Sequence, residues 1–206
     1  MKVLLVTNDS QVFRMGEGKG RRATDLLEEV VGPGLPTPAD DLDDERWYRN
    51  RFQGLLGPAG DRLGGRFTEV RNLHDRLSAE HEASLKVISG RYGLIDASDP
   101  IVPYHHPVGS RKEIDELERR TGFVEDLVRV MKEYECVVFL LPKAFVGVLK
   151  ERGVFVTDGT VIAVTSRDFK ECLDRRPNCL FMERRGARVG RENAGLIRST
   201  LKRLRL

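Results

Sequence analysis

The stretch KVLLVT, residues 2–7, is an apolar run that a polar loop follows directly. Similar runs rich in valine, isoleucine and leucine occur at Leu85–Ser89, Cys136–Leu141 and Val161–Thr165, and a weaker fifth run is Cys179–Met182. Near-continuous apolar runs of this length are typical of strands buried on both faces of a sheet. We therefore predict a central sheet of four to five strands.

Segments with a helical period separate these runs. In one segment, apolar residues recur every three or four positions at Phe67, Val70, Leu73 and Leu77. In the next segment, the same spacing connects Ile114, Leu117, Val124, Leu127, Val128 and Met131. Strands that alternate with helices are joined by crossover connections, which place the strands in parallel. The predicted fold class is α/β, with three layers and helices on both faces of a mostly parallel sheet.

The length of 206 residues, with 40% hydrophobic content, is sufficient for one domain that spans residues 1–206. Within it, the stretch GPGLPTPADDLDD, residues 32–44, consists of glycines, prolines and acids that favour neither helix nor strand. A short predicted helix follows, before a second glycine and proline cluster at residues 57–60. We interpret the region from about 32 to 65 as an insertion that caps the sheet.

The sequence predicts a cytoplasmic protein with no membrane partner. No apolar run approaches the roughly 20 residues that cross a bilayer, and the N-terminus turns polar too early for a signal peptide. The three cysteines form no C-x-x-C pair, which favours reduced structural thiols. We predict no metal site and no cofactor.

Basic residues are concentrated at the C-terminus. Residues 184–206 contain eight arginines or lysines and one glutamate, whereas the net charge of the whole chain is only +3. A helix is predicted at about 190–206, with basic residues along one stripe at Arg191, Arg198, Lys202 and Arg205, next to an apolar face of Ile197, Leu201 and Leu204. Such a stripe is suited to the phosphates of a nucleic acid. The alternative is the solvated outer face of a docked terminal helix.

Ligands of parallel sheets bind beyond the carboxyl ends of the strands. The loop after the first predicted strand, TNDSQVFRMGEGKGRR at residues 7–22, combines glycines with basic residues before a predicted helix. This composition favours a phosphate site, for which the candidates are Gly18, Lys19, Gly20 and Arg21. The loop matches neither common phosphate-binding motif, so a flexible basic loop is the alternative.

The loop after the second predicted strand is ISGRYGLIDASDPIVPYHHP, residues 88–107. Its glycines permit a tight backbone around Tyr92, whose ring is then free to stack on a planar ligand, while Asp96 or Asp99 accepts a hydrogen bond or activates water. The ligand-binding candidates are Ser89, Gly90, Tyr92, Gly93, Asp96, Tyr104 and His105. The alternative is a glycine-rich turn whose tyrosine packs on the core and whose histidines are solvated.

The stretch SGRYGLIDASDPIVPY, residues 89–104, resembles the signature Ser-Gly/Ala-x-Tyr-Gly-Leu, then Asp, then Ile-x-Pro-Tyr, of the YaaA family of peroxide-stress proteins and related small α/β domains. This chain departs from that family directly after the first strand, where Thr7-Asn8-Asp9-Ser10 replaces a Ser-Pro-Ala-Lys-Thr-like turn. More loosely, Gly93-Leu94-Ile95 and Pro103-Tyr104-His105 are similar to the uracil-DNA-glycosylase-like domain of archaeal tRNA-deazaguanine-modifying proteins.

Both resemblances imply nucleic acid or its bases as the ligand class. The sequence therefore predicts a protein associated with DNA or tRNA, with a nucleobase or nucleotide pocket in the 88–107 loop. If the protein is an enzyme, the second resemblance implies cleavage or exchange at an N-glycosidic bond, with Asp99 as the candidate catalytic carboxylate. The alternatives are a non-catalytic sensor of a nucleotide or other small molecule, and an interaction protein whose loops are structural.

Overall fold

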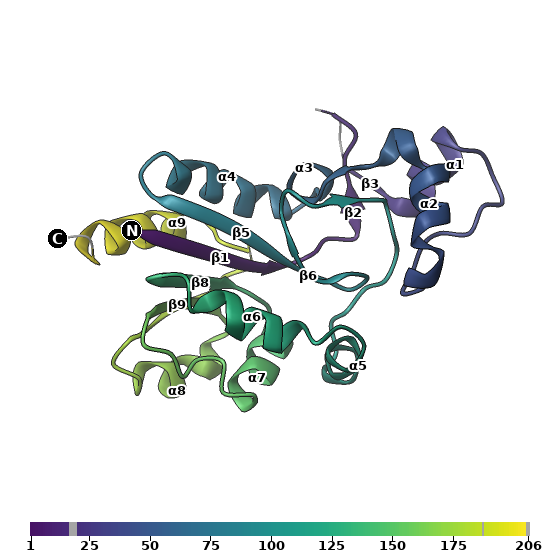
Figure 1. Cartoon of the computed structure of the whole chain (residues 1–206). Coiled ribbons are helices and arrows are strands. Elements are labelled where there is room, and N and C mark those ends of the chain that lie inside the picture. Colours follow the sequence, from purple (N-terminus) through teal and green to yellow (C-terminus); the bar gives the residue numbers. More distant parts are fainter. Residues whose placement is uncertain (17–19, 187, 205–206) are drawn as a thin grey trace.

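The computed structural model describes residues 1–16, 20–186 and 188–204, which form an α/β fold around a six-stranded sheet (Figure 1). The strand order is β10-β9-β8-β1-β5-β6, in which only β6 runs antiparallel to its neighbour. The bounds are β1 Lys2–Asn8, β5 Glu82–Ser89, β6 Gly93–Asp96, β8 Cys136–Leu140, β9 Thr160–Thr165 and β10 Cys179–Glu183. The predicted α/β class with a mostly parallel sheet is confirmed. The additional strand, β6, lies inside the 88–107 loop and has no apolar run of its own.

The central strand β1 explains why the apolar runs do not alternate. Leu5 is paired with Leu85 on one side and with Val138 on the other. Successive side chains of a strand point to opposite faces. Val3 and Leu5 therefore enter one core cluster and Leu4 and Val6 the other, and all four are fully buried.

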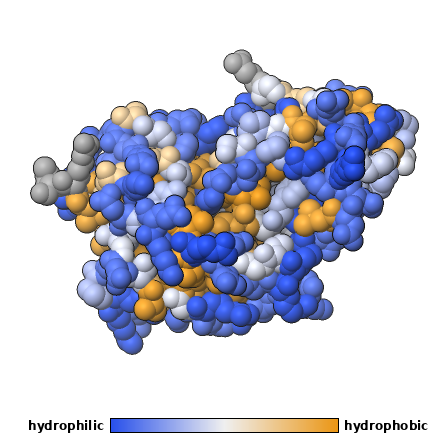
Figure 2. All heavy atoms as spheres, viewed as in Figure 1, coloured by the Kyte–Doolittle hydropathy of each residue, from blue (hydrophilic) through white to orange (hydrophobic). Residues whose placement is uncertain are grey.

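Helices cover both faces of the sheet (Figure 1). One face packs against α4, Phe67–Ser78, and α9, Arg191–Leu204. The other face packs against α5 Arg111–Thr121, α6 Phe123–Met131, α7 Lys143–Glu151 and α8 Lys170–Asp174. Hydrophilic residues cover most of the face seen in Figure 2, and hydrophobic atoms show mainly between the helical layers. No described helix has the length and apolar character needed to cross a membrane.

The apolar residues between Ile114 and Met131 belong to two helices, although their spacing predicts one periodic segment. Gly122 has a φ of 65° and separates α5 from α6, so the helical period restarts at Phe123. Val128 consequently leaves the buried face and is 37% exposed. The start of α5 is fixed by a capping box between Ser110 and Glu113.

The predicted insertion lies beyond the carboxyl ends of β1 and β5 rather than over a face of the sheet (Figure 1). Its residues Tyr48, Phe52 and Leu55 form a small core cluster with Leu27 of the preceding helix and Val102 of the 88–107 loop. The short strands of this part of the molecule are β2 Val12–Phe13, β3 Arg21–Arg22, β4 Gly57–Pro58 and β7 Pro100–Ile101. Its helices are α1 Ala23–Val30, α2 Glu45–Arg51 and α3 Ala59–Arg62, with 3-10 turns at Leu42–Asp44 and Gln53–Leu55. Another 3-10 turn, Arg167–Phe169, precedes α8.

Arg91 holds the insertion to the sheet. Its side chain is fully buried, and its guanidinium pairs with the carboxylates of Asp41 at 2.5 Å and Glu45 at 2.8 Å. The same group lies against the rings of Tyr48 and Tyr92. Two carboxylates therefore compensate one buried cation.

The strand order determines where a ligand site is expected. The chain passes from β1 to its neighbour β5 through α4 on one face, and from β8 to its neighbour β9 through α7 on the other. Connections therefore leave the adjacent strands β1 and β8 in opposite directions. In doubly wound sheets, ligands bind at the carboxyl ends of the strands at such a switch point.

Candidate functional site at the carboxyl edge of the sheet

Asp9 is the carboxylate at this switch point, directly after β1. It is only 5% exposed, and its Oδ2 accepts hydrogen bonds from the Gly90 amide at 2.8 Å and from the Tyr104 hydroxyl at 2.6 Å. Tyr104 also shares a hydrogen bond of 2.7 Å with the Ser89 hydroxyl. Gly90 must be a glycine here, because a Cβ would lie 2.2 Å from the carbonyl oxygen of His106.

Burial dominates the ionisation of Asp9. The loss of solvation raises the pKa of its carboxyl above the usual value. The hydrogen bonds from Tyr104 and Gly90 and the charge of Arg188 act in the opposite direction and reduce this rise. The carboxyl is therefore disposed to hold a proton that an exposed aspartate would release.

Arg188 reaches the same position from the connection between β10 and α9. Its guanidinium donates to the carbonyl oxygens of Asn8 and Asp9 and to the Thr7 hydroxyl, the last at 3.1 Å. The side chain is buried, and this burial lowers its pKa to about 10. The C-terminal part of the chain thus closes over the end of β1.

A cavity of about 440 Å³, here called the edge pocket, opens beside these residues. The lining residues are Asn8, Asp9, Ser10, Gln11, Val12, Gly65, Arg66, Pro107, Val108, Arg184 and Arg188. Three arginines line the edge pocket, and Asp9 is the one acid among the lining residues that the structure describes. The edge pocket therefore has a surplus of positive charge.

The three arginines come from different elements. Arg66 is the N-cap residue of α4 and donates to the Gly186 carbonyl at 2.6 Å, while the backbone of Arg184 continues from β10. Burial lowers the pKa of Arg184, and the nearby charge of Arg66 lowers it further. A bound anion would reduce the mutual repulsion among these guanidiniums.

Gln11 adds a hydrogen-bonding group to the edge pocket. Its side-chain Oε1 is buried and has no hydrogen-bond partner among the described residues. A buried polar atom without a partner costs about 1–3 kcal/mol. A ligand that donates a hydrogen bond to this amide would remove that cost.

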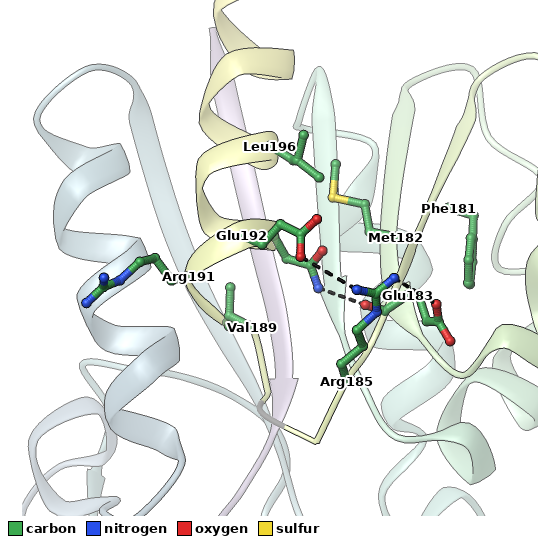
Figure 3. A pocket seen from close by; sticks show the side chains of 10 residues that line it. Phe181, Met182, Glu183, Arg185, Val189, Arg191, Glu192 and Leu196 are labelled. Carbon is green, nitrogen blue, oxygen red and sulfur yellow. Dashed lines mark hydrogen bonds and ion pairs between the residues drawn. The ribbon is translucent and has the colours of Figure 1, made fainter.

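A second groove, between β10 and the first turn of α9, has a different charge balance (Figure 3). Arg185 is paired there with Glu183 at 3.5 Å and with Glu192 at 3.8 Å. Apolar side chains, including Met182 and Leu196, line the remainder, and Arg191 points away from the groove (Figure 3). Because the charges of this groove compensate each other, the edge pocket is the better candidate for an anionic ligand.

The structure brings some predicted ligand residues to the carboxyl edge, but not with the predicted geometry. Ser89, Gly90 and Tyr104 belong to the hydrogen-bond network around Asp9. Tyr104 is fully buried, and the rings of Tyr92 and Tyr104 meet edge to face at 5.6 Å. Tyr104 therefore has no free face for stacking on a ligand, and the half-buried Tyr92 has the guanidinium of Arg91 over its ring.

The other predicted residues of this loop lie elsewhere. Asp99 is exposed in the turn after β6, where its Oδ2 accepts from the Asp96 amide at 2.8 Å, and Asp96 pairs with Lys86 at 2.7 Å. Because β6 is antiparallel to β5, this turn is carried back from the carboxyl edge. Gly93 lies at the first position of β6, and His105 is exposed, whereas the neighbouring His106 is close enough for its charge to act on Asp9.

The predicted phosphate loop is only partly described. Gly18 and Lys19 lie outside the described residues. Gly20 packs closely on the side chain of Val12, and Arg21, in β3, forms an ion pair with Glu29. The structure thus gives Arg21 a carboxylate partner within the protein.

The predicted basic stripe of α9 is partly neutralised. Arg198 and Lys202 both form ion pairs with Glu80, at the end of α4, and Arg205 lies outside the described residues. Arg191 lies on the first turn of α9, beside α4. On the apolar side, Ile197 and Leu201 are fully buried, but Leu204 is 45% exposed, contrary to prediction.

Asp9, Gln11 and Arg66 are not among the ligand residues predicted from the sequence, and Arg184 and Arg188 are included only in the basic segment at the C-terminus. Asp9 and Gln11 had a usable signal, since both follow the first strand directly and the carboxyl ends of parallel strands carry ligand residues. Arg66 had none, because it is far from the other two arginines along the chain and meets them only in the folded protein.

No family model, no curated protein and no solved structure matches this chain. The resemblance of residues 89–104 to the YaaA family, and the looser one to the glycosylase-like domain, therefore stay hypotheses. What the structure adds is a reason for the residue pattern, since Ser89, Gly90 and Tyr104 hold one another and Asp9.

Proposed function

We propose that the protein binds a phosphorylated nucleoside in the edge pocket. The observation that carries this proposal is the convergence of Arg66, Arg184 and Arg188 on one cavity at the switch point of the sheet. Guanidinium groups bind phosphate through charge-assisted and often bidentate hydrogen bonds. The positive surplus, with Asp9 as the single described acid, favours an anion over a neutral or cationic ligand.

The amide groups support a nucleoside rather than phosphate alone. Asn8 and Gln11 line the edge pocket, and the Oε1 of Gln11 is buried without a partner in the described part of the chain. Asn and Gln side chains match the hydrogen-bonding edges of nucleobases, as they do for adenine. A nucleotide of DNA or tRNA presents the same groups, so nucleic acid is included among the test ligands.

Thermal unfolding and calorimetric titration test the proposal. The ligands are the common nucleoside 5′-monophosphates, the unphosphorylated nucleosides and inorganic phosphate, at low salt. A ligand that binds only the native state raises the unfolding temperature. We expect at least one nucleotide to do so, with at least tenfold tighter binding than its nucleoside.

The matched variants are Arg66→Gln/Arg184→Gln and, as the control, Arg129→Gln/Arg175→Gln. The control makes the same change in charge at exposed residues of α6 and the end of α8, on the opposite face. Binding should fall at least tenfold in the first variant and less than twofold in the second. Equal loss in both, or no response to any nucleotide by the folded wild type, contradicts the proposal.

A second candidate function is cleavage of an N-glycosidic bond, and the buried position of Asp9 favours it. A carboxyl whose pKa is raised by burial is suited to act as a general acid. In this reaction the C1′–N bond breaks as Asp9 protonates the departing base. Water then bonds to C1′ and returns one proton to Asp9. This scheme places the catalytic carboxylate at Asp9, whereas the sequence analysis placed it at Asp99.

Release of free base, measured by chromatography, tests this reaction on the ligands that bind. Asp9→Asn should reduce turnover by at least a hundredfold and change affinity less than fivefold, whereas Asp99→Asn should leave both unchanged. Wild-type activity in Asp9→Asn excludes the assigned role. Binding without base release by the wild type leaves the non-catalytic nucleotide-binding function.

A further inference from the structure

A second arginine-lined cavity, of about 480 Å³, is here called the Arg14 pocket. Its lining residues are Arg14, Gly16, Pro58, Asp61, Arg62 and Arg71. Three are arginines, and Asp61 is the one acid among the lining residues for which the structure gives positions. The charge imbalance therefore has the same sign as in the edge pocket.

The guanidiniums of the Arg14 pocket bond mainly to backbone. Arg71 donates to the Gly60 carbonyl and Arg62 to the Leu56 carbonyl, each at 2.8 Å. Carbonyl oxygens carry only partial charges, so these hydrogen bonds do not neutralise the cations. Burial lowers the pKa of Arg71 and the charge of Arg14 lowers it further, whereas the charges of Asp61 and Asp75 act in the opposite direction. An anion between Arg14 and Arg71 would offset this repulsion.

Two chain segments connect the two pockets. Phe13 and Leu63 form an antiparallel bridge, flanked by backbone hydrogen bonds of 2.7 Å from Arg14 to Arg62 and from Gly64 to Val12. Val12 lines the edge pocket, whereas Arg14 lines the Arg14 pocket. At about 3.3 Å per residue, these positions are about 7 Å apart along the strand. The two pockets are therefore lined by neighbouring residues of one short segment.

Two glycines lie between the pockets. Gly65, which is exposed and lines the edge pocket, has a φ of +59° that other residues rarely adopt. Gly64 is buried beneath the side chain of Arg14, because a Cβ there would lie 2.8 Å from Cγ of Arg14. The side chain of Val12 packs against the same glycines.

We propose that the Arg14 pocket is a second anion subsite, and that the two pockets together take a ligand with two phosphate groups, one on each side of Gly64 and Gly65. The proposal rests on the proposed function of the edge pocket, which supplies the first phosphate site. The shared ligand chemistry is a pair of phosphates separated by one nucleoside. A dinucleotide has this chemistry, and so do successive phosphates of a single-stranded nucleic acid.

Calorimetric titration with three probes tests the second subsite. The probes are a nucleoside 5′-monophosphate, a 5′-phosphorylated dinucleotide and a single strand of ten nucleotides. The variants are Arg14→Gln, Arg66→Gln and the control Arg129→Gln, which removes one exposed charge on α6. We expect wild type to bind the dinucleotide at least tenfold more tightly than the monophosphate.

Arg14→Gln should remove this tenfold advantage and change monophosphate affinity less than twofold, whereas Arg66→Gln should weaken both probes. The slope of log affinity against log salt for the dinucleotide should decrease by roughly 0.7 in Arg14→Gln, as expected for one lost phosphate contact on a single strand. If Arg14→Gln binds the dinucleotide as wild type does while Arg66→Gln weakens both probes, the second subsite is wrong and the edge pocket stands. If neither variant differs from the control, both proposals fail.

The third probe separates the two sources of this chemistry. Tighter binding of the ten-nucleotide strand than of the dinucleotide, with the tightening lost in Arg14→Gln, assigns the two subsites to a nucleic acid strand. Equal affinities that both depend on Arg14 assign them to a dinucleotide.

Discussion

Arg91 and Arg188 are both buried, but their surroundings differ in charge. Arg91 is fully buried and meets the two carboxylates of Asp41 and Glu45. Arg188 is 8% exposed and bonds to two carbonyl oxygens and a hydroxyl, with Asp9 and Glu69 as nearby acids and two further arginines lining the same pocket. In the first site two carboxylates pair with one cation, whereas the arginines that line the second outnumber its one lining acid.

This difference separates a structural role from a binding role. Where a buried cation is paired with carboxylates, loss of one partner destabilises the folded protein, and an added anion does not stabilise it. Repulsion among the arginines of the edge pocket costs the native state free energy, and a bound anion would recover part of it, which is the thermodynamic basis of ligand-induced stabilisation. The contrast therefore predicts different responses of stability and binding to substitution.

Arg91→Met should give the largest loss of stability, about 3–5 kcal/mol, because it leaves two partly buried carboxylates without their cation. Urea unfolding measures the loss, and limited proteolysis should show cleavage within residues 32–65, which Arg91 holds in place. Because Arg91 does not line the edge pocket, the folded fraction should bind the nucleotide as wild type does. A loss of about 3–5 kcal/mol in the free energy of unfolding supports the structural role of Arg91, and a loss below about 1 kcal/mol contradicts it. Arg129→Gln is the control variant.

Arg188→Met should cost less stability, about 2–3 kcal/mol, because it leaves carbonyl groups rather than carboxylates without donors. Its effect on binding should be larger than that of Arg91→Met, with at least a tenfold loss of nucleotide affinity. The comparison between Arg91 and Arg188 fails if the two variants lose binding to the same extent at equal folded fraction.

The fold was predictable because its signals are local. The apolar runs of β1, β8 and β9 and the period of α4 each lie within one short segment. Where the signal was ambiguous, one residue decided the outcome. Gly122 divides the periodic segment into α5 and α6, and this division exposes Val128.

The candidate site was less predictable because it depends on residues far apart in the chain. Arg66 and Arg188 are brought to Asp9 by α4 and by the connection from β10 to α9. The tyrosines of the 88–107 loop suggested stacking on a ligand. In the structure Tyr104 is fully buried and its hydroxyl donates a hydrogen bond to Asp9, which the sequence does not predict. The position of the loops after the strands predicted a site at the carboxyl edge, where the edge pocket lies, but the polar partners are determined by packing.

Tyr104→Phe tests the hydrogen bond between Tyr104 and Asp9, and its expected effect on stability is smaller than that of Arg188→Met. It removes one hydrogen bond to a buried carboxyl and keeps the ring packing against Phe13, so the expected loss is about 1–2 kcal/mol. Urea unfolding measures it, and Tyr134→Phe, at a half-buried tyrosine near the amino end of β8, is the matched control. An equal loss in the two variants indicates that the bond to Asp9 contributes nothing.

Asp9→Asn should have the smallest effect at neutral pH and a distinctive dependence on pH. Because burial raises the pKa of Asp9 in the native state, the native protein holds a proton that the unfolded chain releases near pH 3.9. The contribution of Asp9 to stability is therefore greatest at low pH. It falls as pH rises from the unfolded pKa through the native one, by about 1.4 kcal/mol for each pH unit that separates the two pKa values.

Wild type should therefore exceed Asp9→Asn in stability by more at pH 4.5 than at pH 7.5, measured by urea unfolding. Arg129→Gln, which does not titrate in this range, should follow wild type. A difference that grows with pH instead would mean that the charge of Arg188 outweighs burial. The edge pocket would then contain a compensated ion pair like that of Arg91.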